Sequence, residues 1–369
     1  MKNPLSPEET PVPPPRGVRL GLIGLGWAAA NCHLPALQML RAEGWPIEVA
    51  ALCDLVPGRL QTAAEEWPGA ALGDDAVALL DRADLDGVLI LTHPDSSARL
   101  LRLAIERGRT TFVEKPVAPT LAEVSRSAEL AMAGQVRVQV GYNRRYQPLA
   151  AEYARLLQRL GPQRHIKVDF WRAGRQEAGF YNDTLVHCLD FVSQHLGKLQ
   201  LEGVQVWPAD APGLLAHGWR IDLGSVRDHR LTAEIDIRPA VGRDLECYTT
   251  IGGSLSITLQ YPHVGAGDGR AGLTVYEAGR ERVIYHTRVT NGETDRKCRL
   301  SGFLRQMAEF CQLCAGTRPV PRCGLDAAME ALRLREEIAV RLSNDVSRLH
   351  RSGTDGECAF PSSQPIQPS

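Results

Sequence analysis

Apolar and polar positions in the first part of the chain alternate between short apolar runs and longer helical stretches. The runs predict strands at Val18–Gly24, Ile47–Asp54, Leu85–Thr92, Arg109–Lys115 and Val136–Asn143. The stretches between them have helical periodicity, and several stop at a glycine, which commonly ends a helix. Strands that alternate with helices need crossover connections, so this pattern predicts a doubly wound parallel sheet, covered on both faces, within residues 17–146.

After residue 164 the pattern changes to a two-residue alternation, which is typical of strands with one covered face. The segments that show it are 165–171, 230–239, 254–263, 273–279 and 281–289. Two helical stretches follow, at 301–314 and 325–343. We therefore expect an α+β domain over residues 147–343, built on an open, mainly antiparallel sheet.

Both ends of the chain lack this patterning. Residues 1–16 are rich in proline and lack the apolar segment of a signal peptide, and residues 344–369 are polar, so we expect a disordered arm and a disordered tail. The longest apolar runs are far shorter than the roughly 20 residues that cross a bilayer. We expect a cytoplasmic protein without a membrane partner.

Charge and cysteine content narrow the function further. A formal net charge of −1 provides no basic surface for nucleic acid, so a small neutral or mildly charged ligand is expected. The 9 cysteines are scattered, which is typical of reduced thiols. Cys311 and Cys314 form a CxxC inside a helical stretch, without a second pair at zinc-site spacing, so buried thiols are favoured over a metal or redox site.

The end of the first predicted strand carries a nucleotide-binding pattern. Gly24, Gly26 and Ala29 form GxGxxA at the head of a helix, where glycines allow a tight turn and a close approach to a pyrophosphate. Asp54 ends the second strand, where a carboxylate can accept both ribose hydroxyls and would repel a 2′-phosphate. The two features predict a Rossmann domain that binds NAD in preference to NADP. The alternative is that Asp54 is an ordinary loop acid.

Lys115 stands out because the chain has five lysines and uses arginine at nearly every other basic position. It stands at the end of the predicted strand Arg109–Lys115 and directly precedes Pro116. An ammonium group can lose its proton inside a protein, whereas a guanidinium stays charged. The position therefore hints at a chemical role for Lys115.

A helix predicted to begin near residue 183 has one polar face and one apolar face. Its polar residues are Asp183, His187, Asp190 and Gln194. Taken alone, this is the pattern of an ordinary amphipathic helix with a solvated stripe. Arg172 and Arg175 also allow two interpretations. They could contact a carboxylate or phosphate of a substrate, or they could be solvated at the surface. The abundance of arginine in the chain favours solvation.

Five segments together resemble the glucose-fructose oxidoreductase, inositol 2-dehydrogenase and MocA (Gfo/Idh/MocA) family, over about residues 18–342: GLIGLGWAA, CDLVPGRL, EKPVA, GYNRRY and DTLVHCLD. The resemblance implies that Lys115 is catalytic, with a cis proline at Pro116, and that Asp183 and His187 act with it. Residues 141–144 match the stretch that lines the family's interdomain cleft. The chain departs from the family at Leu185, where glycine is common, and at His93 and Ser97, where many members have proline and histidine.

The predicted sites follow from these motifs. The cofactor residues are Gly24, Gly26, Trp27, Ala29, Asp54, Thr92, Glu114 and Lys115, and the candidate substrate residues are Tyr142, Arg144 and Arg172. No metal site is predicted.

The function implied by the resemblance is NAD-dependent hydride transfer between nicotinamide and a secondary alcohol or ketone of a sugar, cyclitol or related polyol. Either Lys115 or His187 could carry the proton. The alternatives are an NAD-using glycosidase of the same fold and a non-catalytic cofactor-binding regulator, and the presence of Lys115, Asp183 and His187 together disfavours the regulator. The one-faced sheet and the family both favour a homodimer or homotetramer.

Overall fold

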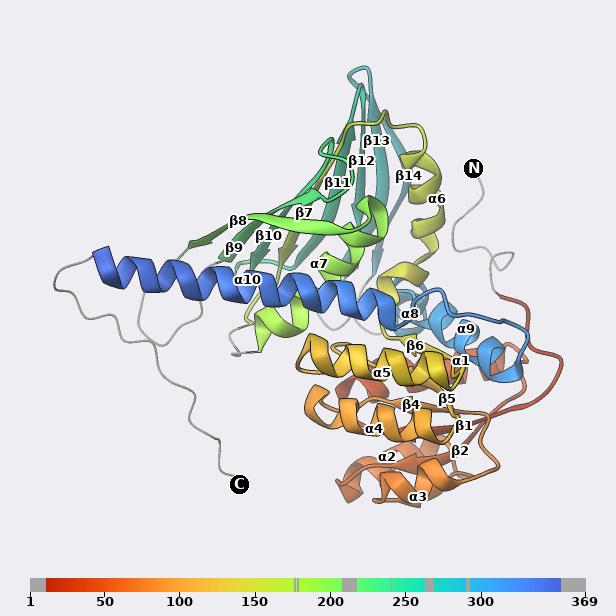
Figure 1. Cartoon of the computed structure of the whole chain (residues 1–369). Helices are drawn as coiled ribbons and strands as arrows, with labels where there is room; N and C mark the ends of the chain where they lie inside the picture. The colour runs from red at the N-terminus through yellow and green to blue at the C-terminus, as the bar shows by residue number, and fades with distance from the viewer. Residues whose placement is uncertain are drawn as a thin grey trace.

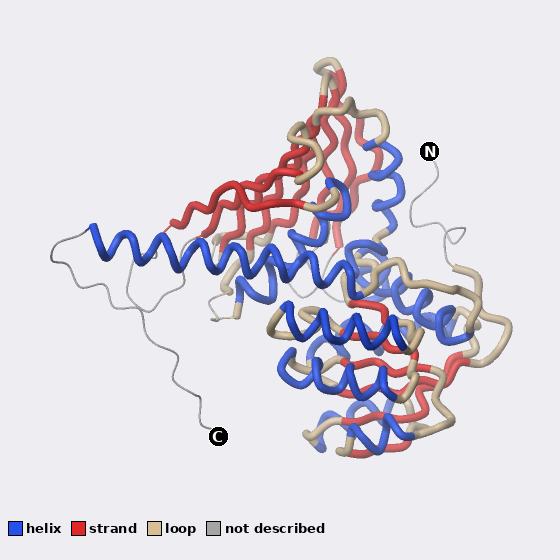
Figure 2. The backbone as a smooth tube through the Cα atoms, viewed as in Figure 1, coloured by secondary structure: helices blue, strands red, loops and turns tan. Residues whose placement is uncertain are grey.

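The structure is a computed structural model with two halves, each built on one sheet, and a long helix runs between them (Figures 1 and 2). It describes residues 11–352 except 176, 178, 208–217, 240, 263–268 and 290–292, and it describes no side chain beyond residue 343. The predicted arm and tail therefore lie largely outside the described residues.

The first sheet is parallel throughout, with strand order β3-β2-β1-β4-β5-β6. Its strands are β1 (Val18–Ile23), β2 (Ile47–Cys53), β3 (Ala71–Gly73), β4 (Gly87–Ile90), β5 (Thr110–Val113) and β6 (Val138–Val140). The order steps outward from β1 in both directions, so the predicted doubly wound sheet is confirmed. Only the exposed three-residue strand β3 lacked an apolar run that could predict it.

Helices follow most of these strands. They are the π-helical turn η2 (Ala29–His33), α1 (Leu34–Ala42), α2 (Pro57–Glu66), α3 (Ala76–Asp81), α4 (Pro94–Glu106) and α5 (Leu121–Ala133). Two helices from the far end of the chain, α8 (Thr294–Leu300) and α9 (Phe303–Ala315), also join this half. The buried side chains of α9, including Phe310, pack into one apolar core with β1 and α1. The two halves of the molecule are therefore interleaved in sequence.

The second sheet has eight strands in the order β14-β13-β12-β11-β7-β10-β9-β8. They are β7 (Arg164–Trp171), β8 (Leu199–Trp207), β9 (Gly218–Ser225), β10 (Leu231–Arg238), β11 (Leu245–Gly252), β12 (Leu255–Gln260), β13 (Gly269–Glu277) and β14 (Arg280–Val289). Only β7 and β10 pair in parallel, so the prediction of an open, mainly antiparallel sheet is confirmed. The alternation missed β8, β9 and β11; in β11 the buried face carries the polar residues Glu246 and Thr250.

One face of this sheet is covered within the chain. Helix α6 (Pro148–Leu157) packs against β12 and β13, and α7 (Phe180–Leu196) packs against β7 and β10. The opposite face carries the exposed side chains of Ile251, Tyr276 and Val283.

Helix α10 (Leu325–Ser352) runs between the two halves (Figure 1). It contacts α5 and β6 on one side and α7 and β8 on the other. Its backbone continues past residue 343, where the second domain was expected to end. A short 3-10 turn, η3 (Asn143–Tyr146), links β6 to α6 and brings the GYNRRY segment to the junction of the two halves.

Candidate active site

The largest group of predicted site residues meets in one cavity of about 580 Å³ between the two halves. The predicted residues that line it are Trp27, Thr92, Glu114, Lys115, Arg144, Arg172, Asp183 and His187. Lys115 follows β5 of the first sheet, whereas Arg172 follows β7 of the second. The cavity therefore lies where ligands bind in doubly wound folds, beyond the carboxyl ends of the parallel strands.

The glycine turn after β1 has room for a dinucleotide. Gly24 has a φ of +90°, and a Cβ there would lie 2.9 Å from the backbone of Leu91, so only glycine fits. A Cβ at Gly26 would meet no atom within 4 Å, which leaves the surface above this residue open. Helical residues begin at Trp27, and Ala29 is fully buried. The open surface and the helix N-terminus fit a pyrophosphate group.

Asp54 lies beside this turn, at the end of β2. Its Oδ2 accepts a hydrogen bond from the backbone N–H of Leu25 at 2.6 Å, and its Oδ1 accepts one from Val56 at 2.8 Å. Each carboxylate oxygen can still accept a further hydrogen bond. Asp54 thus fixes the glycine turn, while Arg59 approaches its carboxylate to 3.7 Å.

Lys115 projects into the cavity from the turn after β5. The Lys115–Pro116 peptide bond is cis, as the resemblance implied. The Nζ atom donates a hydrogen bond to the backbone carbonyl of Asp183, at 3.2 Å. Burial lowers the pKa of Lys115; the carboxylates of Glu114 and Asp183 act against that change without cancelling it. A lowered pKa makes the neutral amine, which can accept a proton, more accessible.

Glu114 is held by two contacts beneath Lys115. Its Oε1 lies 2.7 Å from Nε2 of His33, and its Oε2 accepts the backbone N–H of Lys115 at 2.9 Å. Burial raises the pKa of Glu114, but its hydrogen bond to His33 and its interactions with Lys115 act against burial, and the net pKa is lowered. His33 is fully buried and was missed, because nothing in its sequence neighbourhood marks it. The His33–Glu114 pair secures the turn that presents Lys115.

Helix α7 differs from the expected amphipathic helix. Buried residues occur on every side of it, because it lies between the second sheet and α10. Of the predicted polar stripe, His187 and Asp190 are buried, so a fully solvated stripe is wrong. Asp190 forms a 2.7 Å ion pair with Arg145 and does not line the cavity. His187 and Asp183 remain on the cavity.

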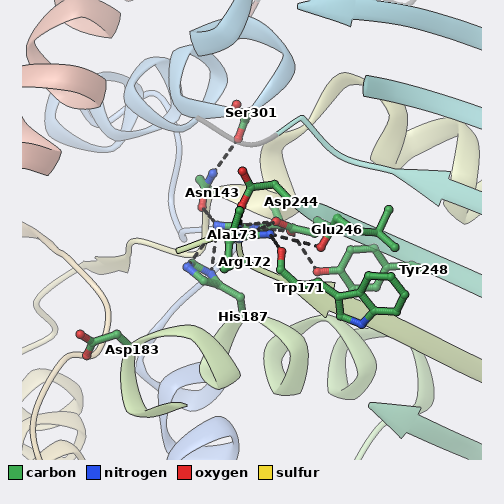
Figure 3. Close-up of polar contacts among 12 residues, drawn as sticks. Asn143, Trp171, Arg172, Ala173, Asp183, His187, Asp244, Glu246, Tyr248 and Ser301 are labelled. Carbon is green, nitrogen blue, oxygen red and sulfur yellow. Dashed lines mark hydrogen bonds and ion pairs between the residues drawn. The ribbon is translucent and has the colours of Figure 1, made fainter. Parts of the chain in front are cut away.

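A buried ionic cluster lies behind His187. Glu246 is 2% exposed and pairs with Arg144, at 2.7 and 2.8 Å, and with Arg172, at 2.6 Å. Tyr248 adds a hydrogen bond to Glu246 at 3.1 Å. Figure 3 shows Arg172 and Glu246 facing each other beside the His187 ring. Surface solvation, which the sequence favoured for Arg172, is therefore wrong.

Glu246 is the main site residue that sequence reasoning missed. The signal that could have found it is the two-residue spacing of Glu246, Tyr248 and Thr250, which puts all three side chains on the buried face of β11. Tyr142, a predicted substrate residue, is buried behind the His187 ring, with ring centroids 6.3 Å apart, and does not line the cavity. Its contact with a substrate remains a prediction.

The cluster sets the charge state of His187. The Nη1 atom of Arg144 lies 3.2 and 3.1 Å from the two ring nitrogens of His187. Burial lowers the pKa of His187 well below its usual value, and the nearby cations Arg144, Lys115 and Arg172 lower it further. His187 is therefore neutral at physiological pH, and its imidazole can donate a hydrogen bond to a ligand or accept one from it.

The remaining chemistry-bearing groups are structural. The cysteines in the described part of the chain, including Cys311 and Cys314 of α9, are free thiols. Within the described residues, no cluster of His, Cys, Asp and Glu could hold a metal ion. No described helix is both long enough and apolar enough to span a bilayer. The parallel sheet, the glycine turn and the cavity together fit the class of nicotinamide-dependent dehydrogenases.

Comparisons with known proteins agree with this class. Residues 18–142 match the model of the Gfo/Idh/MocA oxidoreductase family, which has an NAD-binding Rossmann fold. An inositol 2-dehydrogenase of Gluconacetobacter diazotrophicus is 27% identical over 250 residues, which cover 62% of this chain and 70% of that protein. An inositol 2-dehydrogenase of Pseudarthrobacter chlorophenolicus is 33% identical over 200 residues, covering 51% and 57%.

A solved structure shares the fold of both domains. The 3-ketoreductase KijD10 of Actinomadura kijaniata, in complex with NADP and TDP-benzene, matches with a TM-score of 0.69 at 17% identity. The match covers 86% of this chain and 95% of that one.

Proposed function

We propose that this protein transfers hydride between NAD and a secondary alcohol or ketone of a sugar, cyclitol or related polyol. One observation carries the proposal: a single cavity holds Lys115, Asp183 and neutral His187 beside the glycine turn after β1. The names of the inositol 2-dehydrogenase relatives agree with such a substrate. Bound nicotinamide would supply the acceptor or donor of the hydride.

In the proposed reaction, Lys115 takes the proton of the substrate hydroxyl. Its lowered pKa makes the amine form accessible, and its Nζ lies on the cavity beside α7. His187 is a poor proton acceptor, because burial and Arg144 disfavour the imidazolium. We assign it a hydrogen bond to the reacting oxygen. The carboxylate of Asp183, on the first turn of α7, binds a neighbouring hydroxyl (Figure 3).

The proposed cofactor is NAD in preference to NADP. Asp54 lies beside the glycine turn, where its carboxylate would repel a 2′-phosphate. NADP is bound by the structurally similar KijD10, and Arg59 of this chain lies near Asp54, so the preference needs a direct measurement.

The proposed assembly is a homodimer or homotetramer. The open face of the second sheet carries Ile251, Tyr276 and Val283, which are 49%, 41% and 47% exposed. Apolar side chains grouped on one face commonly mark a protein interface.

The test of the function is a panel of cyclitols, aldoses and their keto forms, each assayed with NAD⁺ or NADH by absorbance and by product analysis. Net formation of NADH together with a ketone supports the proposal. Release of a sugar without net NADH would indicate the glycosidase. Tight nucleotide binding without any turnover would indicate a regulator.

A further inference from the structure

The lining of the cavity carries charges of both signs. Arg144 of η3 and Arg172, which follows β7, share one carboxylate, that of Glu246, so this buried cluster has an excess of positive charge. The lining of the cavity also includes Lys115 and the carboxylates of Glu114 and Asp183. Buried charge without a counter-ion is costly. An anion placed against the arginines would therefore be stabilised.

Arg172 retains hydrogen-bond donors for such an anion. Its side chain is 3% exposed, and it stacks on Phe170 with the guanidinium carbon 3.8 Å from the ring centroid. Nη1 donates to the carbonyls of Trp171 at 3.0 Å and Leu245 at 3.2 Å, and Nη2 donates to Glu246 at 2.6 Å. A guanidinium has five N–H groups. Among the described residues, Nε and one hydrogen of Nη2 have no acceptor.

Arg175 adds a second cation to the same cavity. It lies in the loop between β7 and α7, its side chain is 40% exposed, and it pairs with Glu177 two residues later. Exposed ion pairs of this kind contribute little to stability. The guanidinium of Arg175 can therefore turn from this pair toward a ligand at small cost.

We propose that the substrate carries a carboxylate, held by Arg172 with the help of Arg175, and that the protein acts on a sugar acid. The inference rests on the proposed function and names the substrate class of the same site. A planar carboxylate matches the fork of donors on a guanidinium. With its carboxylate against Arg172 and its hydroxyl at Lys115, the substrate is fixed at two points. The two contacts would select which of its carbons takes part in hydride transfer.

The experiment compares matched pairs of probes. D-Glucuronate is compared with D-glucose, and D-galacturonate with D-galactose, while D-glucose 6-phosphate tests a phosphate in place of the carboxylate. We measure kcat/KM with NAD⁺, and we measure binding by calorimetry in the presence of NAD⁺. We expect kcat/KM to be about ten- to a hundredfold higher for the acid of at least one pair, which is the scale of a hydrogen bond to a charged group.

Variants locate the effect. Arg172→Met leaves the Arg144–Glu246 pair intact, and it should reduce the ratio of kcat/KM between acid and neutral sugar to near one. Arg175→Gln should reduce the ratio by a smaller factor. Arg230→Gln is the matched control, because Arg230 is an exposed arginine that also pairs with a carboxylate two residues away, that of Asp228. It should leave the ratio unchanged. Thermal melting checks that each variant is folded.

Each outcome bears on the inference. Equal kcat/KM for acids and neutral sugars, or an unchanged ratio in a folded Arg172→Met, overturns the carboxylate site while the proposed function stands. A preference for the phosphate overturns the carboxylate as the group bound. Calorimetric binding of a uronate that weakens in Arg172→Met, without any turnover, supports the carboxylate site and contradicts the proposed function. Absence of uronate binding overturns the inference.

Discussion

Lys115 and His187 are both pushed toward their neutral forms in the same cavity. Burial lowers the pKa of each, and the cationic neighbour Arg144 adds to the effect on both. The two residues nevertheless differ in their ability to accept a proton. A histidine with a pKa well below its usual value is a poor base, whereas a lysine with a lowered pKa becomes a usable one. The structure therefore supplies a reason, absent from the sequence, to choose Lys115 as the proton carrier.

Lys115→Arg should reduce turnover by about a hundredfold or more, because arginine cannot release a proton under these conditions. NAD binding should be largely kept. In the unmodified protein, kcat/KM for oxidation should rise as pH rises through the pKa of Lys115, which lies below 10.5, since only the amine accepts the proton. The measurement is steady-state kinetics against pH, with NAD titration as the control. Near-normal turnover in the variant would remove Lys115 from the mechanism.

Asp54→Ala should change the choice of cofactor. The unmodified protein should bind NAD(H) about tenfold or more tightly than NADP(H), because the carboxylate repels the 2′-phosphate. The variant loses the hydrogen bonds to Leu25 and Val56 as well, so both affinities can fall, but their ratio should move toward NADP(H). Fluorescence titration gives the ratio. An unchanged ratio would show that Asp54 only holds the turn.

At the scale of elements, the sequence predicted the strands and helices that have a single clear period. The parallel strands were readable because apolar runs such as β4 are buried on both faces. The burial of helix α7 could not be predicted in this way. It is buried on several sides because it lies between the second sheet and α10, and no local sequence pattern encodes that position. Strand β11 was missed because Glu246 occupies an apolar position of the alternation, and its partners Arg144 and Arg172 are distant in the sequence.

Glu246→Gln tests the role of β11. The two arginines lower the pKa of Glu246 from 4.5 to about 2 although burial acts to raise it. Because the folded-state pKa is the lower one, the carboxylate stabilises the fold above pH 4.5, and this contribution is lost as the pH falls toward 2. The variant should lose about 3–5 kcal/mol at neutral pH, since it leaves two buried cations without their anion.

Denaturant unfolding at several pH values measures this effect. The stability difference between the unmodified protein and Glu246→Gln should shrink as the pH falls below 4.5. Glu152→Gln is a suitable control, because Glu152 forms an exposed pair with Arg155 on α6. Equal stability of the unmodified protein and Glu246→Gln at neutral pH would show that the buried cluster does not hold β7 and β11 together.

At the scale of the whole molecule, both halves contribute to the one cavity. Helix α10 contacts elements of both halves, and α9 packs into the core of the first half (Figure 1). The C-terminal helices therefore connect the two halves that line the cavity. The sequence could predict both sheets and eight of the nineteen residues that line the cavity. It could not predict the excess positive charge of the buried cluster, because that charge depends on which side chains the fold pairs.

The open face of the second sheet leads to a prediction about assembly. Light scattering at micromolar concentration should give the mass of a dimer or tetramer. Tyr276→Asp, on the open face, should shift the mass toward that of a monomer, since it places a charge in the expected interface. Met132→Asp, on the exposed surface of α5, is the control and should not change the mass. A monomer for the unmodified protein would contradict the proposed interface.

The most direct test of the account follows a labelled hydride. A substrate found in the panel is prepared with deuterium on the carbon that bears the reacting hydroxyl and is incubated with NAD⁺, and both products are analysed by mass spectrometry. The account predicts that the deuterium appears in NADH and that the other product is the corresponding ketone. Deuterium that stays in, or returns to, a released sugar without net NADH would contradict it.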